Sequence, residues 1–200
     1  MILLTAILAG WLTGVLIARL QNRTWSLPGI RSTWLVLAAF IPQLLCVYLP
    51  ATRRYIPDGW ASAGLLISQA LLLNFCWYNR RTPGIWLLAL GLSLNLLVML
   101  ANGGFMPISP QTANRIVSPQ MMQLVTIGDR FGNGKDILLA VANTNLAWLS
   151  DRFLPPQGFA YQVAFSLGDV VIAAGAFWLM LAPAKIPNNF TNQTKRLLND

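Results

Sequence analysis

Long apolar stretches alternate with short polar connections along most of the chain. Five stretches are apolar enough to be predicted as membrane helices, at residues 1–20, 34–49, 60–78, 85–101 and 163–181. About 20 apolar residues in a helix cross the hydrocarbon core of a bilayer. The pattern therefore predicts an all-α integral membrane protein, a bundle of about five transmembrane helices in a single membrane domain over residues 1–186. A polar tail follows at 187–200.

The connection between the fourth and fifth stretches, residues 102–161, is long for an idle loop and is interrupted by glycine and proline. Within it, residues 128–134 favour a plain turn, with a hairpin or an ion-binding loop as alternatives. Residues 137–149 are apolar but too few to span a bilayer, so we expect an interfacial or re-entrant segment there.

The composition supports a membrane location. Charged residues make up 10% of the chain and hydrophobic residues 56%, whereas soluble domains carry about 25% charged residues. The net charge is +8. Cytoplasmic loops of membrane proteins are rich in Lys and Arg, and this explains the positive charge without nucleic acid as a partner.

The positions of the basic residues predict an orientation. Basic residues follow the first stretch, the third and the fifth: Arg19, Arg23 and Arg31, then Arg80 and Arg81, then Lys185, Lys195 and Arg196. The positive-inside rule places these regions in the cytoplasm. We therefore expect a protein of the bacterial cytoplasmic membrane with its N-terminus outside, its C-terminus in the cytoplasm and residues 102–161 outside. Arg53 and Arg54 then lie outside, against the rule.

Several kinds of chemistry are excluded by composition. The chain has no His, and its six carboxylate side chains are all Asp. A Ser-His-Asp triad and a His-ligated metal are therefore impossible, and we expect no metal and no cofactor. Cys46 and Cys76 lie in apolar stretches, where cysteine usually acts as a small hydrophobic residue.

Residues inside the apolar stretches also predict helix contacts. Small residues recur every four positions in the first stretch, at Ala6, Gly10, Gly14 and Ala18. This spacing lets helices approach closely, within the protein or against a partner. Pro42 is expected to kink the second helix. Uncharged polar residues are expected to hydrogen-bond neighbouring helices more often than to bind a ligand: Gln43, Gln69, Asn74 and Asn95.

Asp169 is the most unusual residue because it lies inside the fifth apolar stretch. A carboxylate near the centre of a membrane helix costs about 2.5–3.5 kcal/mol on the insertion scale, so intramembrane Asp residues usually face the protein interior and are often functional. Asp151 precedes it by 18 residues. If the two meet, they share a proton, and one can act as base while the other acts as acid. The alternatives are that Asp169 binds backbone amides or Arg152, and that Asp151 pairs with Arg152 or caps a turn.

At these positions the chain resembles an uncharacterised family of bacterial multi-pass membrane proteins. The resemblance rests on Asn-Gly-Gly-Phe-Met-Pro-Ile-Ser at 102–109, Leu-Ser-Asp at 149–151, Phe-Ser-Leu-Gly-Asp-Val-Val-Ile at 165–172 and Asn-Arg-Arg-Thr-Pro-Gly at 79–84. It covers nearly the whole chain. It implies the architecture and no activity.

A second, motif-level resemblance is to lipoprotein signal peptidase, an aspartic peptidase of the bacterial inner membrane. Asn102 and Gly104 lie on its outer-face Asn-x-Gly motif, and Asp169 follows Phe165 as in its last motif, with Ser166 where that family has Asn. The resemblance implies catalytic Asp151 and Asp169, with substrate contacts from Asn102, Gly103, Gly104, Ser166 and Arg152. Two departures are five predicted spans in place of four, and Leu149-Ser150 in place of Val-Val before the first Asp.

These observations lead to three functional hypotheses. The first is an aspartic-type membrane peptidase that acts on a lipidated peptide. The second is a non-catalytic accessory or scaffolding subunit of a larger membrane complex. The third is a transporter or small-molecule binding protein in which Asp169 binds a proton or a cation. The expected partners are membrane lipid and either a lipidated peptide or other membrane-protein subunits.

Overall fold

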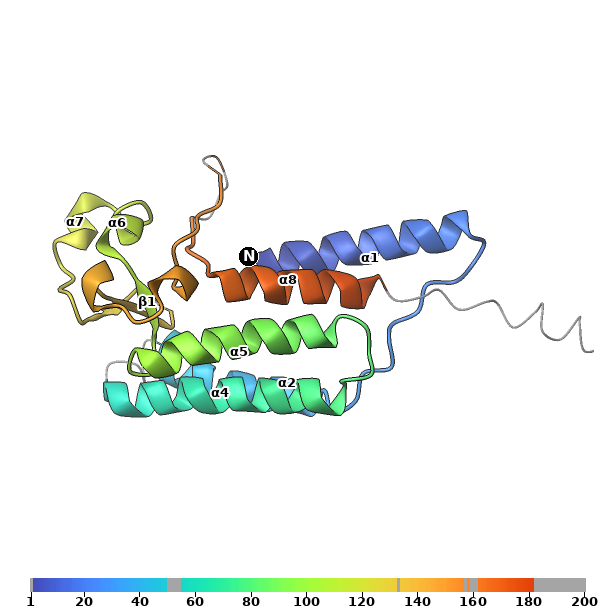
Figure 1. Cartoon of the computed structure of the whole chain (residues 1–200), viewed down its shortest axis with the longest axis horizontal. Helices are drawn as coiled ribbons and strands as arrows, with labels where there is room; N and C mark the ends of the chain where they lie inside the picture. The colour runs from blue at the N-terminus through green and yellow to red at the C-terminus, as the bar shows by residue number, and fades with distance from the viewer. Residues whose placement is uncertain (1, 50–54, 133, 157, 159–161, 182–200) are drawn as a thin grey trace, which may run out of the picture.

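The protein is mostly helical (Figure 1). The structure, a computed structural model, describes residues 2–49, 55–132, 134–156, 158 and 162–181. Its long helices begin and end close to the predicted limits: α1 (Ile2–Leu20), α2 (Trp34–Gln43) with a π-helical turn η1 (Leu44–Tyr48), α4 (Asp58–Tyr78), α5 (Ile85–Ala101) and α8 (Leu167–Met180). The predicted tail at 187–200, its basic residues, Lys185, and the Arg53–Arg54 pair lie outside the described residues.

Two of these helices, α1 and α4, are long and apolar enough to cross a membrane. The helices α2, α5 and α8 are apolar but shorter. This length and apolar composition give weak support for a membrane location, since a buried core helix of a soluble protein or an N-terminal signal sequence can have the same length and composition.

The long helices pack as a row in which the order along the chain is not kept (Figure 1). The helix α8 packs between α1 and α5, and α4 packs between α5 and α2. In this order α1 is an edge helix, with its main contacts to α8. The centre of the row is therefore α5, and α8, the last helix among the described residues, lies between α5 and α1.

Glycine brings α8 close to both of its neighbours. A Cβ atom on Gly10 would lie 2.6 Å from the carbonyl oxygen of Phe177, and one on Gly175 would lie 2.6 Å from the backbone nitrogen of Leu88. Gly10, Gly14 and Ala18 are buried in α1. The small-residue face of α1 is thus used within the protein, against its own α8.

Polar residues within the helices bind neighbouring helices, as predicted for Gln43. Its side-chain amide donates to the Ser68 hydroxyl (2.5 Å), and this hydroxyl donates to the backbone oxygen of Ala39 (2.7 Å). Pro42 lies inside α2, directly before the π-helical turn η1. A proline removes a backbone donor, and this loss is consistent with the altered hydrogen bonding that follows.

Residues 102–161 contain a small sheet, so the all-α prediction is wrong for this segment. Three strands, β1 (Met106–Ile108), β2 (Arg130–Phe131) and β3 (Asp136–Leu138), are ordered β1-β3-β2. The strand β3 pairs in parallel with β1 and antiparallel with β2. Short helices α6 (Pro110–Ala113) and α7 (Pro119–Met122) lie between β1 and β2.

The sheet bears on the predictions for 128–134 and 137–149. Residues 128–132 and 134 belong to a hairpin of β2 and β3, so the hairpin alternative is confirmed in place of the plain turn. Residues 137–149 form the end of β3 and two 3₁₀ turns, η2 (Val141–Asn143) and η3 (Ala147–Leu149). Their interfacial or re-entrant position stays a prediction.

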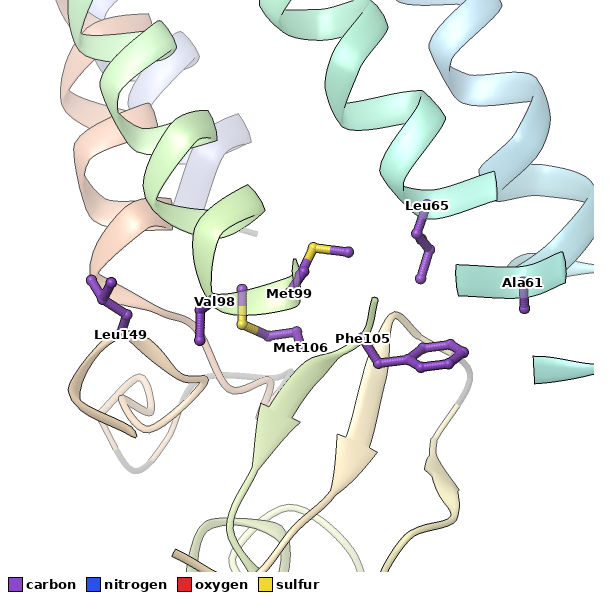
Figure 2. Close-up of a cluster of buried hydrophobic side chains, with 7 residues drawn as sticks. All are labelled: Ala61, Leu65, Val98, Met99, Phe105, Met106 and Leu149. Carbon is purple, nitrogen blue, oxygen red and sulfur yellow. The ribbon is translucent and has the colours of Figure 1, made fainter. Parts of the chain in front are cut away.

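A buried apolar cluster fixes this segment on the ends of α4 and α5 (Figure 2). It joins residues from both helices to residues of the 102–161 connection, which we call the outer segment after its expected position: Ala61, Leu65, Val98, Met99, Phe105, Met106 and Leu149. Arg130 adds a polar contact, because its guanidinium donates to the backbone oxygen of Cys46 (2.8 Å) and lies 3.3 Å from a carboxylate oxygen of Asp58.

Candidate functional site

Lys135 is the centre of the candidate site, although it was not among the predicted site residues. Its ammonium nitrogen lies 3.6 Å from Oδ2 of Asp151 and 3.5 Å from Oδ2 of Asp169. The structure therefore places both predicted catalytic residues at one cation. Lys135 is the single lysine of 102–161, but it lies in a polar, glycine-rich stretch where a charged residue is ordinary.

The small sheet brings these groups together. The backbone oxygen of Lys135 accepts from Met106 (3.0 Å), which fixes Lys135 beside the start of β1. The backbone nitrogen of Asp151 donates to the oxygen of Pro107 (3.0 Å), and Asp151 forms a parallel bridge with Ile108. Residues from both sides of β1 thus reach the first turn of α8, where Asp169 lies.

Asp169 serves a structural role at the start of α8. Ser166 and Asp169 form a capping box, in which the Asp169 carboxylate accepts from the Ser166 backbone nitrogen (3.1 Å) and the Ser166 hydroxyl accepts from that of Asp169 (3.0 Å). Asn95 of α5 donates to the same carboxylate (2.8 Å) and accepts from the Ser166 hydroxyl (2.8 Å). The carboxylate of Asp169 is therefore held by a backbone amide, by Asn95 and by Lys135.

Asp151 has a different environment. It is 1% exposed, and its Oδ1 has no hydrogen-bond partner among the described residues. The side chains of Asp151 and Asp136 lie close enough to affect each other's titration, and Oδ1 of Asp136 is also buried without a hydrogen-bond partner in the described chain. Asp136 was missed by the sequence reasoning, because nothing in its spacing marked it.

Burial and charge shift the titration of these groups. Burial raises the pKa of the Asp151 carboxyl well above its ordinary value and raises that of Asp136 too, although Lys135 opposes both shifts. Burial lowers the pKa of Lys135, but the carboxylates of Asp151 and Asp169 outweigh this effect and raise it overall. The raised pKa favours the charged ammonium form of Lys135.

Arg152 does not form the ion pair that was offered as an alternative for Asp151 and Asp169. Its guanidinium lies over the ring of Phe153, 5.8 Å from the centroid, and among the described residues both carboxylates form ion pairs with Lys135. Adjacent residues in extended chain point to opposite sides, so Asp151 faces inward while Arg152 is exposed.

The predicted substrate-binding residues at 102–104 shape the end of α5. The Asn102 side-chain amide donates to the backbone oxygens of Val98 (2.7 Å) and Asn145 (2.9 Å), and its oxygen accepts from the Asn145 nitrogen (2.9 Å). Gly103 and Gly104 have φ of +77° and +90°, and a Cβ atom on Gly104 would collide with Ser62. Their described contacts are thus with the turn around Asn145 and with α4. None of these contacts is with Lys135, Asp136, Asp151 or Asp169, the four residues that we call the Lys135 cluster.

Comparison with known proteins places the chain in a family. A family model described as a family of unknown function, DUF5317, matches residues 29–181. The chain belongs to this family. No curated protein and no solved structure matches it. The match includes every residue of the Lys135 cluster, supplies no activity and brings no support for the resemblance to lipoprotein signal peptidase.

The cluster contains two chemically distinct parts. Asp151 and Asp169 both contact Lys135, and carboxylates that share a cation can both be ionised without sharing a proton. Asp136 and Asp151 instead approach each other directly, each with a buried oxygen that has no other partner among the described residues. The carboxyl pair suited to sharing a proton is therefore Asp136–Asp151.

Proposed function

We propose that this DUF5317 protein spans the bacterial cytoplasmic membrane five times and works as a non-catalytic accessory or scaffolding subunit of a larger membrane complex. In this arrangement the N-terminus and residues 102–161 lie outside, and the C-terminus lies in the cytoplasm. Support for membrane insertion comes from large apolar side chains that the helices leave exposed, such as Leu12 (59%), Leu37 (71%) and Trp86 (64%). An exposed apolar surface of this extent is unfavourable in water.

The observation that carries the scaffolding role is how the charged groups of the outer segment are used. Lys135 joins Asp151 of this segment to Asp169 of α8, and Arg130 joins the β2–β3 hairpin to α4 and to Cys46 of η1. These groups hold the outer segment at fixed positions on the helices. This use favours a rigid platform over a reactive centre.

The edge helix α1 is the surface that we assign to a membrane partner. One side of α1 packs closely on α8 through glycine, and the opposite side presents leucines at four-residue spacing: Leu4, Leu8, Leu12 and Leu16. Residues spaced by four share one helix face. A transmembrane helix of another subunit can pack along this face without disturbing the row.

Photo-crosslinking tests this assignment. A photoreactive leucine analogue at position 12 of α1 is compared with the same analogue at Leu90, an exposed position of α5. We expect a defined protein–protein adduct from position 12 and lipid adducts alone from position 90. Lipid adducts at both positions, together with a lone monomer in mild detergent, would contradict the scaffolding role.

A second candidate function is an aspartic-type membrane peptidase acting on a lipidated peptide, with Asp151 as a catalytic residue. The close approach of Asp136 and Asp151 favours it, because two carboxyl groups that share a proton can act as acid and base. The contacts of Asp169 to Ser166 and Asn95 weigh against Asp169 as the second member.

Cleavage assays on lipidated peptides distinguish the two possible catalytic pairs from each other and from the scaffolding role. A peptidase based on Asp151 and Asp169 loses cleavage in both Asp151→Asn and Asp169→Asn. A peptidase based on Asp136 and Asp151 loses cleavage in both Asp151→Asn and Asp136→Asn. A scaffold gives no cleavage that depends on any of these residues.

A further inference from the structure

The charges of the Lys135 cluster do not balance when all its groups are ionised. Three carboxyl groups, from Asp136, Asp151 and Asp169, surround one ammonium group. Asp169 has further donors from Ser166 and Asn95. Asp151 forms an ion pair with Lys135, but Oδ1 of Asp151 and Oδ1 of Asp136 have no hydrogen-bond partner among the described residues. Two ionised carboxylates cannot satisfy each other, because neither has a hydrogen to donate.

The missing donor is a proton. We propose that Asp136 and Asp151 form a proton-binding site that holds one proton between their carboxyl groups, and that release of this proton loosens the outer segment from α5 and α8. The bound proton gives the pair a hydrogen bond and leaves it with a single negative charge. That charge and the charge of Asp169 then face Lys135.

The groups that face the pair come from every neighbouring element. Lys135 precedes β3, Asp169 lies in the first turn of α8, and the uncharged Asn95 comes from α5. The strand β1 contributes no titratable side chain, since it consists of Met106, Pro107 and Ile108. Three other charged residues of the segment have partners elsewhere, since Arg130 pairs with Asp58, Arg152 lies over Phe153 and Asp129 accepts from Thr126. The remaining one, Arg115, is exposed.

The direction of the pH effect follows from comparing the proton affinity of Asp136 and Asp151 in two states, one with the outer segment docked on the helices and one with it released. Burial raises the pKa of both Asp136 and Asp151 above the ordinary 3.8. The folded pair therefore binds a proton more tightly than the same groups do when the outer segment is released into water. The stabilisation is present at low pH and falls as the pH rises from the ordinary Asp range to the raised pKa of the pair.

Infrared spectroscopy of the full chain detects the shared proton directly. A protonated carboxyl group has a carbonyl stretch distinct from that of a carboxylate, and ¹³C-labelled Asp reports on every side-chain carboxyl because the chain has no Glu. The protein is measured near neutral pH in a detergent without ester groups, as wild type, Asp136→Asn, Asp151→Asn and Asp129→Asn. Asp129 is an exposed carboxylate bonded to Thr126 and serves as the matched control.

The shared site predicts one protonated-carboxyl band in the wild type and in Asp129→Asn. We expect that either Asp136→Asn or Asp151→Asn reduces this band to background, since the new amide donates the hydrogen bond and the remaining Asp ionises. No band in the wild type overturns the proposal. Loss in only one of the two variants also overturns it, because it indicates an isolated protonated Asp in place of a shared proton.

Thiol labelling tests the loosening of the outer segment. In a background with Cys46 and Cys76 changed to Ala, the labelling rate of a cysteine at the buried Leu149 is divided by that of one at the exposed Leu124. Both cysteines react with the same reagent, so the effect of pH on the thiol reaction itself cancels in this ratio. We expect it to rise several-fold with pH while Asp136 is present and to stay constant in Asp136→Asn.

A ratio that is independent of pH in both backgrounds overturns the coupling to the outer segment. If the Leu149→Cys chain does not fold, Leu138→Cys provides a second buried reporter, on β3 itself. The infrared and labelling results are independent, so the binding of the proton and its structural consequence are judged separately.

Discussion

Replacement of Lys135 by Met is expected to release the outer segment from the helices, because it leaves two carboxylates without their cation. Lys135 lies 3.6 Å and 3.5 Å from the carboxylate oxygens of Asp151 and Asp169. At an effective dielectric constant of about 20, each contact contributes about 4–5 kcal/mol. Desolvation of the ammonium group offsets several kcal/mol. The net loss of stability is then about 3–5 kcal/mol, in the range observed when one partner of a buried ion pair is removed.

Hydrogen exchange of the backbone amides in the sheet measures this loss. The amides of Met106 and Leu139 hydrogen-bond between β1 and the β3 region, and exchange only when these separate. Since 1.4 kcal/mol corresponds to a factor of ten, Lys135→Met is expected to reduce their protection by roughly 10²- to 4 × 10³-fold at neutral pH. The reduction should be smaller near pH 4, where the raised pKa of Asp151 keeps that carboxyl neutral.

Lys135→Arg is the matched control because it keeps the cation, and it should retain most of the protection. In Lys135→Met combined with Asp151→Asn, the loss should be smaller than the sum of the two single losses. Protection that changes by less than tenfold in Lys135→Met would refute the view that this cation holds the outer segment on α8.

Two further substitutions test the packing around the site. Gly10→Leu should detach α1 from α8, because its first side-chain carbon would already lie 2.6 Å from the Phe177 carbonyl oxygen. A disulfide engineered between the two helices should then no longer form. Gly29→Leu is the control, because the space around Gly29 is open and the disulfide should still form. Asn102→Ala should cost about 1–3 kcal/mol by leaving the backbone groups of Asn145 unpaired; proteolysis near residue 145 should become faster, and an unchanged rate would contradict the assigned role.

The long helices were predictable because their signal is local. Each is an apolar stretch bounded by polar residues or by proline and glycine, and the limits at 85–101 agree with those of α5. The sheet was not predictable in the same way, because its strands have only two or three residues. Its central pairing joins Met106 to Asp136, and no local pattern indicates which segments pair over that separation.

The candidate site was predictable only in part. Asp169 was conspicuous because a charge inside an apolar stretch is rare, and Ser166 three residues earlier matches a capping box, which accounts for the contacts that the structure gives both. Lys135 and Asp136 lay in a polar, glycine-rich stretch where charge is ordinary. Their meeting with Asp151 depends on the parallel pairing of β1 and β3, so their role became visible only in three dimensions.

The central claim is that this chain is a multi-pass membrane protein whose residues 102–161 are held on the outer ends of its helices. Labelling of single cysteines in intact cells tests it most directly, with Cys46 and Cys76 changed to Ala and a reagent that does not cross membranes. A cysteine at Ser118 should react in intact cells, and one at Thr82, in the turn between α4 and α5, should react only after the membrane is permeabilised. Equal reaction at both positions in intact cells, or reaction at Thr82 alone, would contradict the account.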